Sequence, residues 1–98
     1  MEVQFRTGRL RTCYEQCREG EREWGAEVAR RFIQRINLLY AVDTMSDLRT
    51  IRAVRFYALK GERQGTFALR LDRRMRLIVT FPASGAVRIE EVSRHYGD

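Results

Sequence analysis

The sequence is poor in the residues that form disulfide frameworks and metal centres. Its 98 residues include two cysteines, Cys13 and Cys17, and one histidine, His95. Two thiols four residues apart in an expected helix, with no further cysteine, fit neither a metal-ligand set nor a disulfide framework. We therefore expect half-buried free thiols in a reducing cytoplasm, and neither a metal nor another cofactor.

Long apolar runs and proline are equally scarce. The longest apolar stretches, such as 38–42 and 77–79, fall far short of the roughly 18 residues that a membrane span needs. Charges at Glu2 and Arg6 interrupt the apolar core of a possible signal peptide. With 44% hydrophobic residues and one proline, the chain has enough apolar surface to fold throughout. We expect a single cytoplasmic domain over residues 1–98.

Charge is the strongest compositional signal. Nineteen basic residues against thirteen acidic ones give a net charge of +6 and a pI near 10.1. All the basic residues but Lys60 are arginine, whose planar guanidinium binds two phosphate oxygens at once. An arginine bias of the genome and a solvated surface would give the same composition. The balance nevertheless makes a polyanion the first partner to consider, and nucleic acid ranks above an acidic small molecule.

The first half of the chain has helical periodicity. Val3 and Phe5 suit a short edge strand, after which Thr7 can cap a helix that Gly20 ends. The next helix is expected from about Trp24 to Ala41. Its apolar stripe consists of Val28, Phe32, Ile36, Leu39 and Tyr40. A short turn or helix follows from Ser46, so this half is expected to form a helical hairpin with a small addition.

The second half changes to a period of two. Strands are expected at 54–59, 66–71, 75–81 and 86–92, joined by short loops, which favours an antiparallel sheet. A three-residue loop at 72–74 would set Leu69 beside Leu77 on one face, with Arg70 beside Arg76 on the other. Two adjacent guanidiniums repel unless they are solvated or hold an anion, so this register indicates a phosphate site.

Four segments of this half, in this order, resemble the bacterial RelE/ParE superfamily of toxins, and the HigB branch most closely. They are Leu59-Lys60-Gly61-Glu62-Arg63-Gln64-Gly65, Ala68-Leu69-Arg70-Leu71, Met75-Arg76-Leu77-Ile78 and Glu91-Val92-Ser93-Arg94-His95-Tyr96-Gly97-Asp98. The resemblance implies an α+β fold in which an N-terminal helical hairpin packs on a twisted antiparallel sheet. It also implies the toxin of a type II toxin–antitoxin pair, bound by an antitoxin that is often a helix-turn-helix DNA-binding protein.

The activity implied by the HigB-like branch is metal-independent cleavage of messenger RNA in the ribosomal A site. A ribose 2′-hydroxyl attacks its own adjacent phosphate, leaving a 2′,3′-cyclic phosphate and a free 5′-hydroxyl. This reaction needs a base, an acid and positive charge at the developing phosphorane. Histidine has the ordinary pKa best suited to proton transfer near neutrality, about 6.5, so His95 is expected to act as acid or base.

The resemblance assigns roles to the other site residues. Lys60 would stabilise charge at the phosphate or, if desolvated, act as a proton carrier. Arg63, Arg70 and Arg76 would grip the phosphate oxygens. Tyr96 would stack on a base or donate its hydroxyl. The site residues are thus expected to be catalytic His95, Lys60 and Arg76 and substrate-binding Arg63, Arg70, Tyr96 and Tyr57.

The sequence departs from the family pattern at several positions. Several HigB-like proteins have a histidine at the place of Tyr57 and an acidic-tyrosine pair where Ser93 and Arg94 stand, so the second proton carrier stays open. Met75 stands where many relatives have tryptophan. Two other functions therefore remain: a ParE-like inhibitor of DNA gyrase, which needs no proton relay, and a non-catalytic RNA- or ribosome-binding domain.

Overall fold

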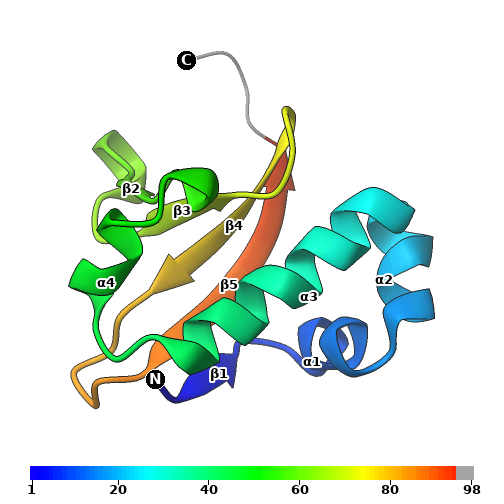
Figure 1. The fold of residues 1–98 in the computed structure, drawn as a ribbon, viewed down its shortest axis with the longest axis horizontal. Coiled ribbons are helices and arrows are strands. Elements are labelled where there is room, and N and C mark those ends of the chain that lie inside the picture. The colour runs from blue at the N-terminus through cyan, green and yellow to red at the C-terminus, as the bar shows by residue number, and fades with distance from the viewer. Residues whose placement is uncertain (95–98) are drawn as a thin grey trace.

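The structure is a computed structural model that describes residues 1–94. Its helices are α1 (Gly8–Glu15), α2 (Cys17–Trp24), α3 (Ala26–Ala41) and α4 (Met45–Arg49), followed by the 3₁₀ turns η1 (Arg52–Val54) and η2 (Gly61–Arg63). The strands are β1 (Val3–Phe5), β2 (Tyr57–Ala58), β3 (Phe67–Arg70), β4 (Met75–Thr80) and β5 (Val87–Arg94). Figure 1 shows the α+β architecture, with helices in the first half of the chain. Within residues 1–94, no helix has the length and apolar character needed to cross a membrane.

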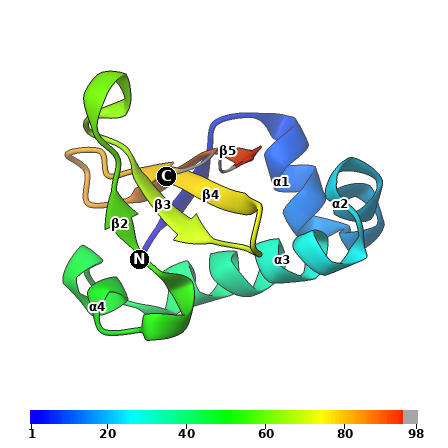
Figure 2. The same ribbon diagram turned by 90° about the horizontal axis from the view of Figure 1, so that it is seen from above.

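The strands form one mixed sheet in the order β1-β5-β4-β3-β2. The pairs from β2 to β5 are antiparallel, as predicted, whereas β1 pairs with β5 in parallel. A parallel pair needs a long crossover connection between its strands. Here the four helices and the β2–β4 strands lie between β1 and β5 along the chain, and α3 runs across one face of the sheet (Figure 2).

The predicted register of the β3–β4 hairpin is confirmed. Leu69 pairs with Leu77 and Arg70 with Arg76, and the Leu71 backbone N–H donates to the Met75 carbonyl over 2.9 Å. Residues opposite each other in neighbouring strands share a face of the sheet. The hairpin therefore has an inner face, which carries Leu69 and Leu77, and an outer face, which carries Arg70 and Arg76.

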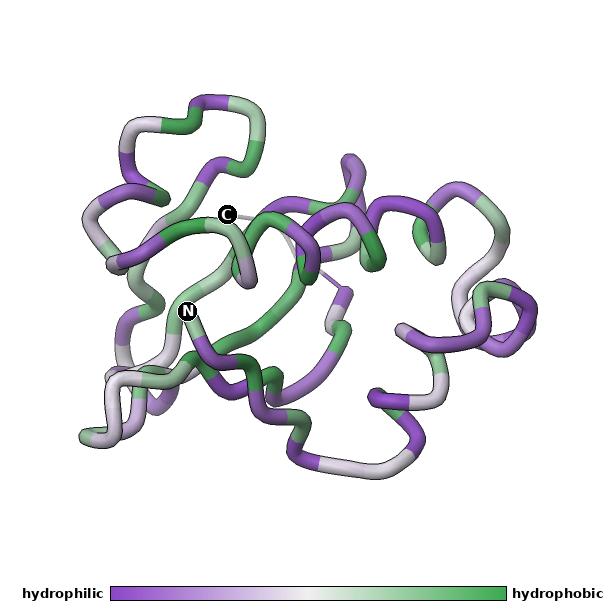
Figure 3. Tube along the Cα trace, turned by 60° about the horizontal axis from the view of Figure 1, so that its bottom comes forward, coloured by the Kyte–Doolittle hydropathy of each residue, from purple (hydrophilic) through white to green (hydrophobic). Residues whose placement is uncertain are grey.

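The inner face packs against the helices. Fully buried strand and helix residues form one cluster, which includes Leu69, Leu77, Val79, Val87, Ile89, Phe32, Ile36 and Leu39. Figure 3 shows the hydrophobic segments gathered in the middle of the molecule. The helix predicted over 24–41 is confirmed as α3, but Tyr40 is 46% exposed and does not join the buried stripe.

The N-terminal helical region differs from its prediction in where it breaks. Thr7 caps α1 as expected, its Oγ1 accepting from the Leu10 backbone N–H at 3.2 Å. Gly20 does not end a helix: it lies inside α2, where an added Cβ would come within 3.2 Å of the Ala29 Cβ. The helix that Thr7 caps ends at Glu15, and α2 ends at Gly25, whose φ of 86° lies in the left-handed region that glycine tolerates. Gly20 thus allows close packing of α2 on α3.

The structure also differs from the predictions for the 54–59 strand, for the start of the helix at Ser46 and for the burial of the two thiols. The strand predicted at 54–59 shortens to β2, because η1 and Arg55, with its φ of 45°, interrupt the extended chain. The helix expected to start at Ser46 is α4, which starts one residue earlier after the capping box of Thr44 and Asp47. Neither thiol is half-buried, since Cys13 is fully buried and Cys17 is exposed. Burial raises the pKa of Cys13, which keeps its thiol protonated.

Candidate functional site

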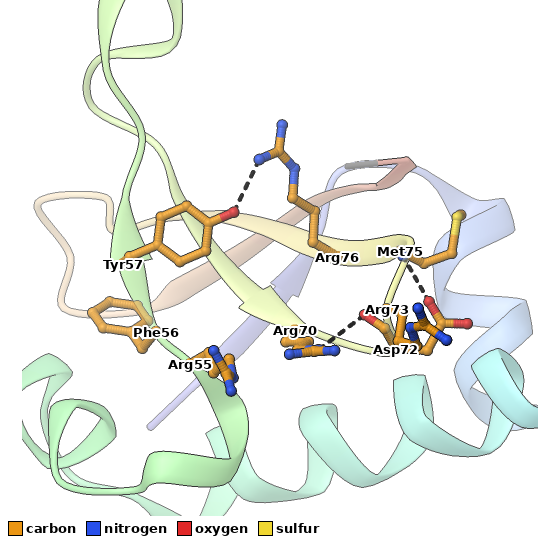
Figure 4. A pocket seen from close by; sticks show the side chains of 8 residues that line it. All are labelled: Arg55, Phe56, Tyr57, Arg70, Asp72, Arg73, Met75 and Arg76. Atoms are coloured by element: carbon orange, nitrogen blue, oxygen red, sulfur yellow. Dashed lines mark hydrogen bonds between the residues drawn. The ribbon is translucent and has the colours of Figure 1, made fainter. Parts of the chain in front are cut away.

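A hollow of about 480 Å³ lies where β2, β3 and β4 meet the 72–74 turn. Its lining, drawn in Figure 4, consists of Arg55, Phe56, Tyr57, Arg70, Asp72, Arg73, Met75 and Arg76. Three of the seven predicted site residues, Tyr57, Arg70 and Arg76, therefore come together in one cavity. They come from three different strands, and the sheet register brings them together.

Arg70 and Arg76 are direct cross-strand partners on the outer face. Like charges directly opposite each other destabilise a sheet unless other groups compensate them. The Arg70 Nε donates to the Asp72 carbonyl oxygen at 3.1 Å. The Arg76 Nη1 donates to the Tyr57 hydroxyl oxygen at 3.0 Å, as Figure 4 shows. These bonds fix both guanidiniums and orient the Tyr57 hydroxyl.

Strand β5 continues the site on the other side of β4. Ser93 pairs with Arg76, and Arg94 pairs with Met75. These are the last residues of the strand, so β5 runs alongside Arg76 to its end. The predicted residues His95 and Tyr96 follow Arg94 directly in the sequence and lie outside the described residues.

The two predicted residues of the 59–65 loop lie elsewhere. Lys60 precedes η2 and is exposed, and it does not line the hollow. The Arg63 Nη2 lies 2.8 Å from the Glu91 Oε2, which forms an ion pair from η2 to β5. Glu91 pairs with Ile78 two residues along β4 from Arg76, so this ion pair lies on the outer face beside the hollow.

The hollow is strongly cationic. Four arginines line it, against the single carboxylate of Asp72. That carboxylate is engaged in the turn, because its Oδ1 accepts from the backbone N–H groups of Arg74 and Met75 at 2.8 and 2.7 Å. Its charge therefore also serves to hold the turn that positions the arginines. Among residues 1–94, no three histidine, cysteine or acidic side chains are grouped to hold a metal ion.

Two lining arginines were missed by the sequence analysis. Arg73 lies in the predicted three-residue loop, so its position on the hairpin was a usable signal. Arg55 gave no such signal, because it was placed in a continuous strand, whereas it has a left-handed backbone between η1 and β2. An arginine in that conformation carries a cost of order 1 kcal/mol or more, and such strain is often found at functional sites.

Comparisons with known proteins give structural matches only. No protein-family model matches the sequence, and no curated protein matches it. A histidine-to-glutamine variant of YafQ from E. coli has a TM-score of 0.65 at 13% identity, over 98% of both chains. A YoeB/ParE toxin from Agrobacterium tumefaciens has a TM-score of 0.60 at 20% identity, covering 98% of this chain and 100% of that one.

A third solved structure is the YoeB–YefM complex from Staphylococcus aureus, with a TM-score of 0.61 at 18% identity over 98% of both chains. The chain therefore has the fold of the RelE/YoeB-type toxins, and the α+β fold predicted from the resemblance is confirmed. These likenesses do not single out the HigB branch, which stays a prediction.

Proposed function

We propose that this chain is the toxin of a type II toxin–antitoxin pair and that its outer-face hollow cleaves messenger RNA on the ribosome. One observation carries the proposal: Tyr57, Arg70 and Arg76 converge on one cationic hollow in a chain with the fold of the YafQ and YoeB toxins. The HigB-like sequence pattern supports the ribosome-dependent reaction in preference to other nucleic-acid functions.

The paired arginines suit the phosphate at which the reaction occurs. When the ribose 2′-hydroxyl attacks, negative charge grows on the non-bridging oxygens of the phosphorane. Arg76 and Arg70 lie side by side and are held in place, so they can bind those oxygens without reorganising during the reaction. Charge-assisted bonds from guanidinium to phosphate are about twice as strong as neutral ones.

The remaining site residues are assigned proton transfer, base stacking and further positive charge. His95 acts as general base or acid by the chemistry of its imidazole, and Tyr96 stacks on a base or donates its hydroxyl. Tyr57, oriented by Arg76, donates a hydrogen bond to the reacting ribose or phosphate. Lys60 and Arg63 supply positive charge from the neighbouring loop, where Lys60 is exposed to an approaching strand. No metal or other cofactor is required by this scheme.

The likeness to a toxin solved with its partner and the net charge of this chain both support an antitoxin partner. YoeB is found in complex with YefM, and this chain has the YoeB fold. With a net charge of +6, the chain would also attract an acidic segment of its partner. We expect an antitoxin encoded beside this protein, of the helix-turn-helix DNA-binding type, to bind it and restore growth when both are expressed.

The test maps RNA ends on translating ribosomes programmed with a defined message. The wild-type protein should produce new 5′ ends inside codons, and His95→Ala and Arg76→Gln should each lower the rate. Loss of one group that stabilises transition-state charge typically costs 10²–10³-fold, so a decrease of roughly that size is expected for Arg76→Gln. Arg30→Gln removes the same charge from an exposed position on α3 and should leave cleavage unchanged.

Three results would contradict part or all of the proposal. Full cleavage by His95→Ala would remove that residue from the mechanism. Relaxed or cleaved plasmid without RNA ends would favour the gyrase inhibitor instead. Binding to ribosomes that weakens with salt, again without new ends, would favour the non-catalytic binding domain.

A further inference from the structure

A second cationic hollow, of about 270 Å³, adjoins the first on the side of α3. Its arginines come from three parts of the chain: Arg31 and Arg35 from α3, Arg55 from the segment before β2, and Arg70 and Arg73 from the β3–β4 hairpin. We call it the α3 groove. Arg55, Arg70, Asp72 and Arg73 line both hollows, so the two form a continuous cationic path.

The α3 arginines are held in place by neutral acceptors. The Arg31 Nη1 donates to the Leu71 carbonyl oxygen at 3.1 Å. The Arg35 Nε donates to the Arg70 carbonyl oxygen at 3.0 Å, and its Nη2 donates to that of Ala53 at 3.5 Å. Carbonyl groups fix the direction of a guanidinium, but they leave its net charge in place.

Acidic side chains compensate little of this charge. Five arginines line the groove against two carboxylates, those of Asp72 and Glu27. Glu27 lies 3.8 Å from the Arg31 Nη2, but its side chain is 63% exposed, and such pairs contribute little. Burial, and then the nearby charge of Arg31, lower the pKa of Arg35. The groove therefore holds several fixed cations that repel one another, and an anion would relieve that repulsion.

We propose that the α3 groove binds an RNA backbone phosphate that flanks the one bound in the outer-face hollow. The chemistry of the groove itself selects for a phosphodiester rather than for a base. That this phosphodiester belongs to RNA rests on the proposed function. The shared arginines place the two phosphates on one path from Arg76 to α3. The strand is either the message itself or ribosomal RNA beside it, and both present the same chemistry.

The test compares Arg31→Gln with Arg30→Gln. Both variants remove one charge from neighbouring positions on α3, but Arg30 is exposed and lines neither hollow, whereas Arg31 lines the groove. Binding is measured over a range of salt concentrations, with a single-stranded RNA oligonucleotide and with empty ribosomes as separate probes. Arg31→Gln should weaken binding about tenfold, as expected for a lost charge-assisted bond. It should also lower the salt slope by about 0.7–0.9, while Arg30→Gln leaves both unchanged.

Glu27→Gln provides a reciprocal variant that does not depend on the folding of Arg31→Gln. It removes a carboxylate from the groove and should tighten binding about twofold. If the groove variants change binding to the oligonucleotide but not to empty ribosomes, the message strand is the ligand. If they change binding to empty ribosomes but not to the oligonucleotide, ribosomal RNA is the ligand. Equal losses for Arg31→Gln and Arg30→Gln, or no effect of Arg31→Gln and Glu27→Gln, would overturn the proposal.

Cleavage measured in parallel separates this inference from the proposed function. If the wild-type protein binds RNA through the groove but makes no cuts, the proposed catalysis fails and the groove stands. If it cleaves normally and the groove variants bind RNA as tightly as the wild type, the groove alone fails.

Discussion

The two faces of the β3–β4 hairpin share one backbone, but the inner face belongs to the hydrophobic core and the outer face lines the cationic hollow. On the inner face, Leu69 and Leu77 are fully buried against the helices. On the outer face, at the position next to each of these leucines, Arg70 and Arg76 line a cationic hollow. Because side chains alternate along a strand, a single register sets both the core and the site. The comparison predicts that inner-face changes affect stability and outer-face changes affect RNA chemistry.

The largest expected effect is on the inner face, for Leu77→Ala. Truncating a fully buried leucine removes its apolar contacts and leaves a cavity, which costs about 2–5 kcal/mol. Urea unfolding should show this decrease in the free energy of unfolding, whereas activity per folded molecule should stay near the wild-type value. Arg88→Gln, at an exposed position on β5, is the control and should unfold like the wild type. A Leu77→Ala protein within about 1 kcal/mol of the wild type would contradict the assigned role of the inner face.

A middle-sized effect is expected on the outer face, for Tyr57→Phe. This variant removes the hydroxyl that accepts from Arg76 and keeps the ring. A charge-assisted hydrogen bond contributes roughly 1.5–3 kcal/mol, so cleavage on the ribosome should fall at least about tenfold.

The matched control for Tyr57→Phe is Tyr40→Phe, because Tyr40 is exposed on α3, away from the hollow. Its rate of cleavage should equal that of the wild type. Equal rates for all three proteins would show that the Tyr57 hydroxyl has no part in the site.

The smallest effect is expected for Glu91→Gln, a substitution at the outer-face ion pair beside the hollow. It breaks the ion pair to Arg63, in which both side chains are partly exposed, so the free energy of unfolding should change by less than about 1 kcal/mol. RNA affinity should rise by a small factor, because one negative charge is lost and Arg63 is released. Glu62→Gln removes the same charge from an exposed position in η2. An equal gain in both variants would mean that releasing Arg63 contributes nothing.

Local patterns were sufficient for much of the fold. The period of two, with a three-residue loop, predicted the pairing of Arg70 with Arg76, because a two-residue loop would instead bury the Arg76 guanidinium among leucines. Thr7 was predicted as a cap because its hydroxyl can satisfy a helix N–H locally. Both features depend on neighbours within a few residues or within one hairpin.

Gly20 and Arg55 show where local patterns fail. A glycine among charged residues resembles a helix end, yet Gly20 lies within α2 because Ala29 of α3 packs close to it. Arg55 belongs to a stretch with strand periodicity, yet it adopts a left-handed backbone at the end of η1. In α3, Arg31 and Arg35 lie outside the predicted apolar stripe, yet both donate to backbone carbonyl groups of Leu71 and Arg70 in the hairpin.

The charge, the order of helices and strands, and the pairing of two arginines across one hairpin could all be read from the amino-acid sequence. These depend on side-chain periodicity and on short-range hydrogen bonds. The hydrogen bond between Arg76 and Tyr57, and the two arginines that α3 adds to the same path, are visible only in the folded molecule. Such contacts join residues far apart in the chain, and their positions follow from how the helices pack on the sheet rather than from any local pattern.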